Sequence, residues 1–272
     1  IEKALEVDIP ERAQALRMVL LEICRINEHL NYHINLCRLF GPDHIRALLY
    51  RRRNEIFELI NDWGGSRIHP TLNRIGGISR DILPDWGTRA LELVNNIVVD
   101  MDAVKKEISR SSQWMDSLKL KIVGAKEAVN WGITGPVLRS TGVKFDKRKE
   151  APFYFYGDLD FEVPLGVFGE CFDLYLVRME EIRQSAKIIS QLLEYLPLGG
   201  ISSTDPQVDF YFRKSEIPKD QYIEKVKNGI KIPPQVLYHS LESPNGELGV
   251  HIIGNGSKFP ERIKFRSPSL PL

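Results

Sequence analysis

The stretch that decides the fold reads CFDLYLVRMEEIRQSAKIISQLLEYL, residues 171–196. Its apolar residues recur every three or four positions, and this spacing places them near one face of an α-helix. They are Leu176, Met179, Ile182, Ile189, Leu193 and Leu196. Because a helix of this kind must bury its apolar face against other elements, the stretch predicts a helical core.

Three segments upstream predict helices that pack with it. Residues 8–39 begin with Asp8 as an N-cap ahead of Pro10 and are apolar on more than one side, as in a buried central helix. A second helix is expected from Asp43 to about Asp62, because Trp63-Gly64-Gly65 would end it. A third has one apolar stripe, made of Leu91, Val94, Val98, Met101, Val104 and Ile108.

The remaining elements are shorter. We expect brief helices at Ala125–Trp131 and Lys219–Lys227, and an ordered loop over Gly132–Pro164, where no periodicity is sustained. Near the end, β-prone runs are separated by Asn245-Gly246 and Asn255-Gly256, dipeptides that suit tight hairpin turns. These runs are Val236–Leu241, Leu248–Ile253 and Arg262–Phe265.

The fold class expected from these elements is mainly α, with a small antiparallel β element near the C-terminus. We expect one domain with a helical core (1–131), an ordered loop (132–169), a long helix (170–197) and an α/β excursion (198–272). The sequence starts at Ile1 inside a helix-like phrase and stops at Leu272 just after a strand-like one. This predicts a piece of a longer chain, and the single domain is therefore expected to be incomplete.

Composition excludes several classes of protein. Among 272 residues, 37 Lys and Arg face 36 Asp and Glu, a balance that argues against a nucleic-acid binder. No apolar run approaches the roughly 20 residues that span a bilayer. Three cysteines in a chain of this length fit a reducing compartment. Because no C-x-x-C pair occurs, we do not expect a zinc or iron–sulfur site formed by this chain alone.

Two groups of residues allow a functional and a structural interpretation. His29 and His33 lie four residues apart on one helix face, where packing or hydrogen bonding is favoured over metal binding. The glutamate of an H-E-x-x-H motif is absent. Arg46 and Arg51–Arg53 are expected to form a solvated face, with a phosphate or an acidic partner as the alternative.

The loop RIHPTLNRIGG, residues 67–77, concentrates two arginines, a histidine and a glycine pair between two long helices. Imidazole titrates near neutral pH and arginine adds a fixed charge, so the loop would suit a redox centre or an anion. An ordinary structural loop is the other interpretation. The glycines of residues 135–142 would let the backbone approach a ligand, although no strand precedes them at nucleotide-binding spacing.

Several phrases together resemble one known family. They are GSRIH (65–69) with RIGG (74–77), GITGPVLR (132–139) with DKRK (146–149), DFEVP (160–164) with GECFD (169–173), YLVRMEEIRQS (175–185), ESPNGELG (242–249) and KFRSPS (264–269). In this order, and across nearly the whole chain, they resemble the quinone-site subunits of respiratory complex I. That family is related to the large subunits of nickel–iron hydrogenases, so the resemblance implies a helical core of the hydrogenase large-subunit type.

The resemblance implies an oxidoreductase function in electron transport. The chain would be one subunit of a proton-translocating NADH:quinone oxidoreductase, inactive alone, that helps form the quinone pocket and packs against the terminal iron–sulfur cluster of a partner subunit. It would bind no metal and no cofactor itself and hold no catalytic residue, while quinone binds at the interface and NAD is used by other subunits. Expected partners are the iron–sulfur small subunit, other hydrophilic-arm subunits and the membrane quinone-channel subunit, at the bacterial cytoplasmic face or the mitochondrial matrix face of a membrane.

The resemblance also assigns individual residues. His69 would lie beside the cluster, with Arg67 and Arg74 in the same loop. The quinone-cavity candidates are Asn35, Leu39, Arg266, Ser267 and Pro268. The family histidine and tyrosine that ligate quinone would fall before Asp8, outside this chain.

One departure from the family pattern leaves an alternative open. A family aspartate falls on Leu39, which can neither carry the charge nor accept the hydrogen bond. With the arginines at 51–53, this allows a non-catalytic structural paralogue that keeps the scaffold but has lost quinone chemistry. A true nickel–iron hydrogenase is disfavoured, because no C-x-x-C occurs.

Overall fold

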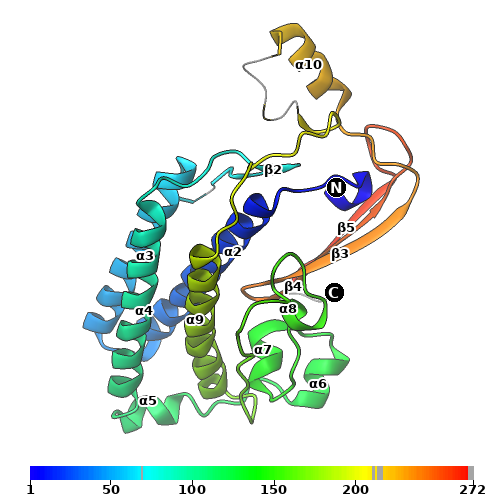
Figure 1. Cartoon of the computed structure of the whole chain (residues 1–272). Coiled ribbons are helices and arrows are strands. Elements are labelled where there is room, and N and C mark those ends of the chain that lie inside the picture. The colour runs from blue at the N-terminus through cyan, green and yellow to red at the C-terminus, as the bar shows by residue number, and fades with distance from the viewer. Residues whose placement is uncertain (69, 210–211, 213–216, 269–272) are drawn as a thin grey trace.

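Four long helices make the body of the molecule (Figure 1). The structure, a computed structural model, describes residues 1–68, 70–209, 212 and 217–268. The long helices are α2 (Glu11–Phe40), α3 (Asp43–Gly64), α4 (Trp86–Ile108) and α9 (Cys171–Glu194). Helix α2 packs against α3 and α9, and α4 packs against the same two helices. The expected mainly helical fold is therefore confirmed, while the hydrogenase-type core stays a prediction.

The apolar faces expected from the sequence meet in one core. Leu16 and Ile26 of α2, Leu49 of α3, Ile97 of α4 and Ile182 of α9 are buried in it. Trp63 and Trp86 pack against each other there, with ring centroids 4.8 Å apart. Burial of such side chains contributes on the order of 2 kcal/mol each, which makes this core the main source of stability.

The start of α2 differs from the expectation. Asp8 is not its N-cap, because the helix begins at Glu11 and Pro10 occupies the capping position without a side-chain hydrogen bond. A residue before proline is driven away from helical geometry, so the helix starts only after Pro10. A short helix, α1 (Glu2–Leu5), comes before it and ends at the left-handed Glu6.

Short helices fill the segment that joins α4 to α9, and a fifth lies beyond α9. They are α5 (Ser112–Ser117), α6 (Ala125–Asn130), α7 (Gly135–Ser140), α8 (Lys147–Glu150) and α10 (Lys219–Asn228). The expectation of a loop throughout 132–164 is therefore wrong, since α7 and α8 lie in it. Helices of one or two turns are too short to show an apolar period in the sequence. Their first turns are instead set by individual residues. Pro136 opens α7, and the Asp146 carboxylate accepts a hydrogen bond from the Arg148 amide at the start of α8.

Two small antiparallel sheets complete the fold. The first pairs β1 (Asn73–Arg74) with β2 (Gly77–Ile78). The second has the order β3 (Val236–Ser243), β4 (Gly246–Ile253), β5 (Arg262–Arg266). This confirms the antiparallel β element near the C-terminus. The tight turn expected at Asn255-Gly256 is wrong, because β4 ends at Ile253 and residues 254–261 form a wider loop.

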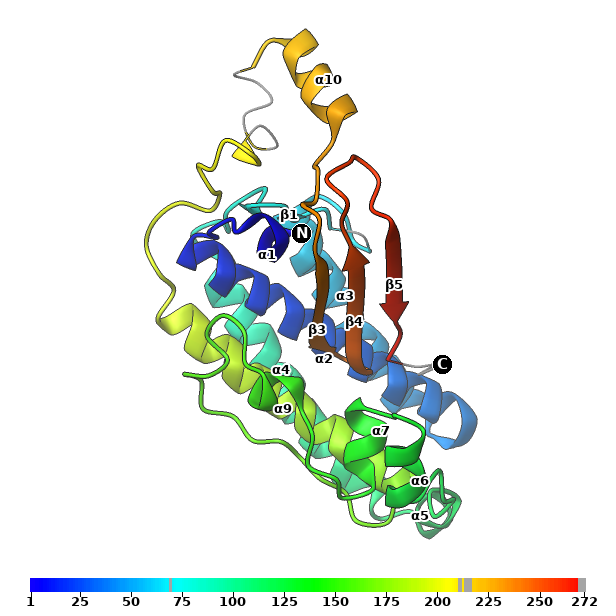
Figure 2. The same cartoon turned by 90° about the vertical axis from the view of Figure 1, so that its right-hand side faces the viewer.

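The β3–β4 hairpin turn sits on the start of α7. Ser243 pairs with Gly246, so the turn at Asn245 is tight, as expected. Gly135 has a φ of +73°, and a Cβ there would lie 2.5 Å from the carbonyl oxygen of Asn245. The sequence predicted that this glycine lets the backbone approach a ligand. In the structure it lets the hairpin turn approach α7 instead. Figure 2 shows the three-stranded sheet beside α2, with α6 and α7 below it.

No helix in the described part of the chain is long and apolar enough to cross a bilayer. The division of the domain into four consecutive parts stays a prediction.

Candidate functional site

The loop predicted to face a redox centre is held from behind by two helices. Arg17 of α2 donates to the carbonyl oxygens of Arg74, at 2.7 Å, and of Gly77, at 2.9 Å. Glu2 of α1 accepts the amide of Gly76 at 2.7 Å and pairs with both terminal nitrogens of Arg17. The backbone of the β1–β2 turn is therefore fixed by a partly buried ion pair.

The two arginine side chains of this loop are exposed to solvent. Arg67 is exposed, with Nη2 at 3.5 Å from Oδ1 of Asn54 and 3.9 Å from a carboxylate oxygen of Glu58. The Arg74 guanidinium is also exposed and has no acidic partner among the described residues. His69, the main candidate from the sequence, lies outside the described residues. The structure thus presents two arginines from one loop, and their proximity to a cluster stays a prediction.

Arg266 at the end of β5 lines a groove. Its Nη2 donates to the Gly132 carbonyl oxygen at 2.7 Å, and its Nη1 donates to that of Glu247 at 2.9 Å. The groove has a volume of about 550 Å³, and its lining is Gly132, Tyr238, His251, Arg262, Lys264, Phe265 and Arg266. Ser267 is exposed and Pro268 is half-buried beside it. A guanidinium fixed beside aromatic rings can donate a hydrogen bond to an amphiphilic ligand.

The candidates on α2 lie apart from this groove. Asn35 and Leu39 are both exposed near the C-terminal end of the helix, and Leu39 is 71% exposed. Neither forms a hydrogen bond or ion pair with Arg266 within the described residues. The two arginine sites are also separate. The Gln235 side chain, next to β3, binds the Ala4 carbonyl oxygen beside the clamped loop, whereas Arg266 lies at the far end of the sheet. Through the register Arg266 lies level with Ser240, five residues beyond Gln235, which corresponds to about 17 Å along the strand.

A larger polar feature was not expected from the sequence. Where α2, α7, α8, α9 and β3 meet, four guanidinium groups face four carboxylates, so their formal charges cancel. All are shielded from solvent. We call this group the buried charge cluster, and its members are Glu22, Arg25, Arg139, Asp146, Arg148, Arg178, Glu181 and Glu242.

Glu22 anchors one end of the cluster. Its carboxylate accepts hydrogen bonds from the hydroxyls of Tyr156 and Ser185, both at 2.6 Å, and pairs with Arg25 at 3.1 Å and Arg148 at 3.2 Å. Burial alone would raise the pKa of Glu22, but the two guanidinium groups and the hydroxyls outweigh it and hold the pKa at about 2. Glu22 is therefore ionised at neutral pH.

Arg139 forms the centre of the cluster. Its Nε lies 2.8 Å from a Glu181 oxygen, and its Nη1 lies 2.8 Å from a Glu242 oxygen. Burial opposes the charge on Arg139, while the carboxylates raise its pKa. Arg148 pairs in turn with Asp146 at 2.7 Å. Arg25, Arg139 and Arg148 thus each pair with a carboxylate, the condition under which buried ions are tolerated. Arg178 binds neutral groups instead, the His29 ring and the Asn245 side chain.

His29 links the cluster to the β3–β4 hairpin as a neutral group. Burial lowers the pKa of His29 to about 4, although the nearby Glu181 raises it. Its Nε2 lies 2.7 Å from Glu181 and its Nδ1 lies 3.0 Å from Nη1 of Arg178. Since Arg178 can only donate, Nδ1 must accept, and the proton of the neutral ring sits on Nε2.

Because both ring nitrogens of His29 are engaged, the hydrogen-bonding interpretation of the His29–His33 pair is confirmed for His29. His33 is buried, and its ring packs edge-on against Tyr175 at 5.2 Å between centroids. The arginines of α3 follow the expectation of a solvated face only in part, because Arg51 is exposed whereas the Arg52 side chain is 15% exposed. Arg46 pairs with Asp43 and Arg52 pairs with Asp100.

The cluster fixes the position of the hairpin. Arg25 donates to the carbonyl oxygens of Ser243, at 2.9 Å, and Glu242, at 2.7 Å. Arg178 donates to Oδ1 of Asn245 at 2.8 Å and stacks on Tyr32. Through β4 these contacts also fix β5. The groove at Arg266 therefore depends on charges that lie inside the helical core.

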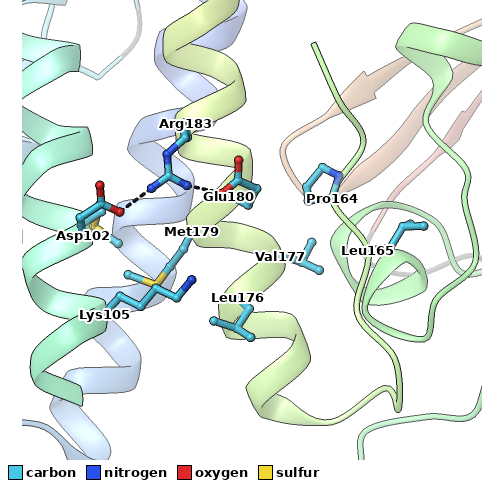
Figure 3. A pocket seen from close by; sticks show the side chains of 10 residues that line it. Asp102, Lys105, Pro164, Leu165, Leu176, Val177, Met179, Glu180 and Arg183 are labelled. Carbon is cyan, nitrogen blue, oxygen red and sulfur yellow. Dashed lines mark hydrogen bonds and ion pairs between the residues drawn. The ribbon is translucent and has the colours of Figure 1, made fainter. Parts of the chain in front are cut away.

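A second pocket lies between α4, α9 and the Pro164–Leu165 segment (Figure 3). Its volume is about 290 Å³. Arg183 bridges Asp102 of α4 and Glu180 of α9 at its rim, and Lys105 lies nearby. Leu176 and Met179 contribute apolar walls. Arg183 and Lys105 together balance the charges of Asp102 and Glu180, and none of the site residues predicted from the sequence lines this pocket.

In the described part of the chain, no three His, Cys, Asp or Glu side chains are grouped as metal ligands. Burial raises the pKa of the thiols of Cys24 and Cys37 to about 11, so both stay protonated at neutral pH. Thiolate, and not thiol, is the form that binds metals.

Comparison with known proteins supports the resemblance independently. The model of the family "Respiratory-chain NADH dehydrogenase, 49 Kd subunit" matches residues 41–271. The D subunit of the NADH-quinone oxidoreductase of Methylacidiphilum infernorum is 34% identical over 99% of this chain and 66% of the relative. The D subunits of the same enzyme from two other bacteria are also similar. That of Ehrlichia ruminantium is 31% identical over 98% of this chain and 70% of the relative, and that of Pelobacter propionicus is 34% identical over 99% of this chain and 68% of the relative.

The chain spans about two thirds of the length of these curated relatives. The family match covers most of the chain, from within the α2–α3 junction to the end of the three-stranded sheet. The chain belongs to the family of the 49 kDa subunit of respiratory-chain NADH dehydrogenase.

Proposed function

We propose that this chain is the subunit of a complex I-type NADH:quinone oxidoreductase that helps form the quinone pocket and packs against the terminal iron–sulfur cluster of a partner subunit. The observation that carries the proposal is the family match over 41–271, with relatives named as the D subunits of NADH-quinone oxidoreductases. Two arginine-bearing surfaces, the loop with Arg67 and Arg74 and the groove at Arg266, supply the chemistry on this chain.

The loop acts through fixed charge. An iron–sulfur cluster held by thiolates carries net negative charge, and the cluster supplies the electrons. Arg67 and Arg74 are permanently protonated and exposed, so they suit contact with an anionic centre on another chain. This chain orients those cations and excludes water where the two subunits meet.

The groove acts by orientation. A quinone headgroup is a flat ring with two hydrogen-bond acceptors, so it needs an apolar wall and a fixed donor. Phe265 and Tyr238 supply aromatic surface, and Arg266 supplies donors held in place by backbone carbonyls. Ser267 and Pro268 continue this edge of the cavity.

We place the subunit in the peripheral arm, against the membrane. Its partners are the iron–sulfur small subunit, other hydrophilic-arm subunits and the membrane quinone-channel subunit. The face is the bacterial cytoplasmic one or the mitochondrial matrix one, and NAD reacts at other subunits. Quinone is the substrate at the interface.

The test of this function is replacement of His69 by glutamine in the intact complex. If His69 takes up a proton when the partner's cluster is reduced, the midpoint potential of that cluster falls with rising pH, and His69→Gln flattens this dependence. Redox titration followed by electron paramagnetic resonance at several pH values measures it. An unchanged pH dependence would remove the assigned role.

The alternative, a non-catalytic structural paralogue, is favoured by one observation. Leu39 replaces a family aspartate, and its side chain is largely exposed. The Leu39→Asp variant of the intact complex separates the two functions. Quinone reduction that is absent with Leu39 and restored with Asp supports lost chemistry, whereas normal turnover with Leu39 refutes it.

A further inference from the structure

The ion pair between Arg17 and Glu2 holds the β1–β2 turn through several hydrogen bonds. The Arg17 guanidinium makes five hydrogen bonds, two to Glu2 and one each to the Tyr154 hydroxyl and the carbonyl oxygens of Arg74 and Gly77. Their lengths lie between 2.7 and 2.9 Å. Such planar, multidentate geometry is specific to arginine, since lysine offers only a point charge.

Glu2 completes this clamp from the other side. One oxygen accepts the amide of Gly76 at 2.7 Å, and both oxygens orient Arg17. Residues beyond α9 close the turn, because the Ser203 amide donates to the Gly76 carbonyl oxygen and the Ile78 amide donates to that of Ile201. Helices α1 and α2 and the 201–203 segment therefore immobilise the backbone from Arg74 to Ile78.

The immobilised backbone carries a free cation. The side chain of Arg74 leaves the turn on the exposed side, and no acidic group among the described residues pairs with it. Arg17, by contrast, is more than four-fifths shielded and neutralised by Glu2. One arginine of this region therefore serves the architecture, and the other is available to a partner.

We propose that Arg17 is a positioning residue that fixes the Arg74 guanidinium against an anionic redox centre on a partner subunit. The inference rests on the proposed function, in which that centre is the terminal iron–sulfur cluster. A nearby cation stabilises the reduced, more negative cluster, so it raises the midpoint potential. Arg17 acts on this potential through the backbone of Arg74 and not through its own charge, which Glu2 cancels.

The experiment compares Arg17→Gln, Arg74→Gln and the double variant in the intact complex. The midpoint potential of the partner's terminal cluster is measured by redox titration with electron paramagnetic resonance, at fixed pH and normalised to cluster content. We expect each single variant to shift the potential to more negative values. We also expect the double variant to equal Arg74→Gln alone, because residues that act through one another are not additive.

Two further variants isolate geometry from charge. Arg17→Lys keeps the charge but cannot reach five acceptors, so it is expected to shift the potential as Arg17→Gln does. Arg12→Gln is the matched control, because Arg12 is also a partly buried arginine of α2 but binds Asp81 and the Pro197 carbonyl oxygen instead. It is expected to leave the potential unchanged.

The outcomes are distinguishable. An additive double variant, or a normal potential in Arg17→Lys, overturns the positioning role while the proposed function stands. No shift in Arg74→Gln overturns the assignment of the loop to the cluster and the inference with it. Should Arg17→Gln prevent assembly, Tyr154→Phe removes only one of the five bonds. It is expected to give a smaller shift of the same sign, and an unshifted potential there contradicts the inference.

Discussion

Single residues inside the helical core decide where the surface sites lie. Glu22, Arg25 and His29 interrupt the apolar pattern of a helix that is otherwise buried on several sides. A charge on a buried helix must find a partner, so these three residues were a usable sign of an internal ionic group. The identity of the partners was not accessible, because Arg139, Arg148 and Glu181 come from segments more than 100 residues further along the chain.

Glu22→Gln is expected to lower the free energy of unfolding by about 3–5 kcal/mol, the usual cost of removing one charge from a buried pair. The amide has one oxygen, so it can still accept from Tyr156 or from Ser185 but not from both. It also leaves Arg25 without its counter-charge and Arg148 with Asp146 alone. Urea unfolding at pH 7 measures the loss. The exposed Glu92→Gln serves as control and is expected to change stability by less than about 0.5 kcal/mol. Equal effects of the two variants would show that the cluster contributes nothing.

Acid is expected to weaken the fold in two steps. The pKa of His29 is about 4 in the folded chain and 6.5 for the free group. Between these values the unfolded chain binds more protons, so stability falls as pH drops from 6.5 to 4, by on the order of 3 kcal/mol. The pKa of Glu22 is depressed from 4.5 to about 2 in the folded chain. Its protonation therefore lowers the stability further as the pH drops from 4.5 to 2.

Unfolding measured between pH 7 and 4 in wild type and His29→Gln separates the first step. The variant lacks one of two buried rings, since burial also holds the pKa of His33 well below its usual value. Its curve is therefore expected to be flatter than that of wild type from pH 6.5 to about 4.5, but not flat. A wild-type curve without any slope in that window contradicts a neutral, buried His29.

At the scale of elements, long helices were predictable and short ones were not. The apolar stripes of α3, α4 and α9 mark these helices directly, and α2 is marked by a long apolar pattern on several sides. The helices α7 and α8 are too short for any period, and they depend on Pro136, Asp146 and the hairpin packed on them. The strands were recognised from their composition. The length of the β4–β5 loop was not predicted, because the dipeptide Asn255-Gly256 alone does not determine it.

Gly135→Ala tests the contact between α7 and the hairpin. The residue has a φ of +73°, and an added Cβ would meet the Asn245 carbonyl oxygen at 2.5 Å. We expect a loss of at least about 1 kcal/mol and faster hydrogen exchange in β3 and β4. Gly87→Ala in α4 is the control, since its nearest contact is an ordinary 3.8 Å to Leu193. That variant is expected to be neutral or more stable, and equal exchange in both variants would dismiss the contact.

At the scale of the whole molecule, one helical core carries two surface sites at opposite ends of a small sheet. The clamped loop lies near α1, and the groove lies near α6 and α7 (Figure 2). The loop 67–77 could be singled out from its residues, since its arginines and histidine suit a redox centre or an anion. The groove at Arg266 was recognisable only through a family resemblance, because it has no motif with chemistry of its own. The buried charge cluster joins the hairpin to the core, and it explains how a three-stranded sheet with little apolar packing keeps its place.

The groove at Arg266, as part of the quinone pocket, is the feature on which the proposed function most directly depends. The direct measurement is the KM for quinone of the intact complex carrying Arg266→Gln. The control is Arg110→Gln, since Arg110 is an exposed arginine after α4 and does not line the groove. Loss of the fixed donor is expected to raise the KM about tenfold, which corresponds to a charged hydrogen bond of roughly 1.4 kcal/mol. Arg110→Gln is expected to leave it unchanged. An unchanged KM in Arg266→Gln, or the same rise in both variants, would contradict the assignment of the groove to quinone.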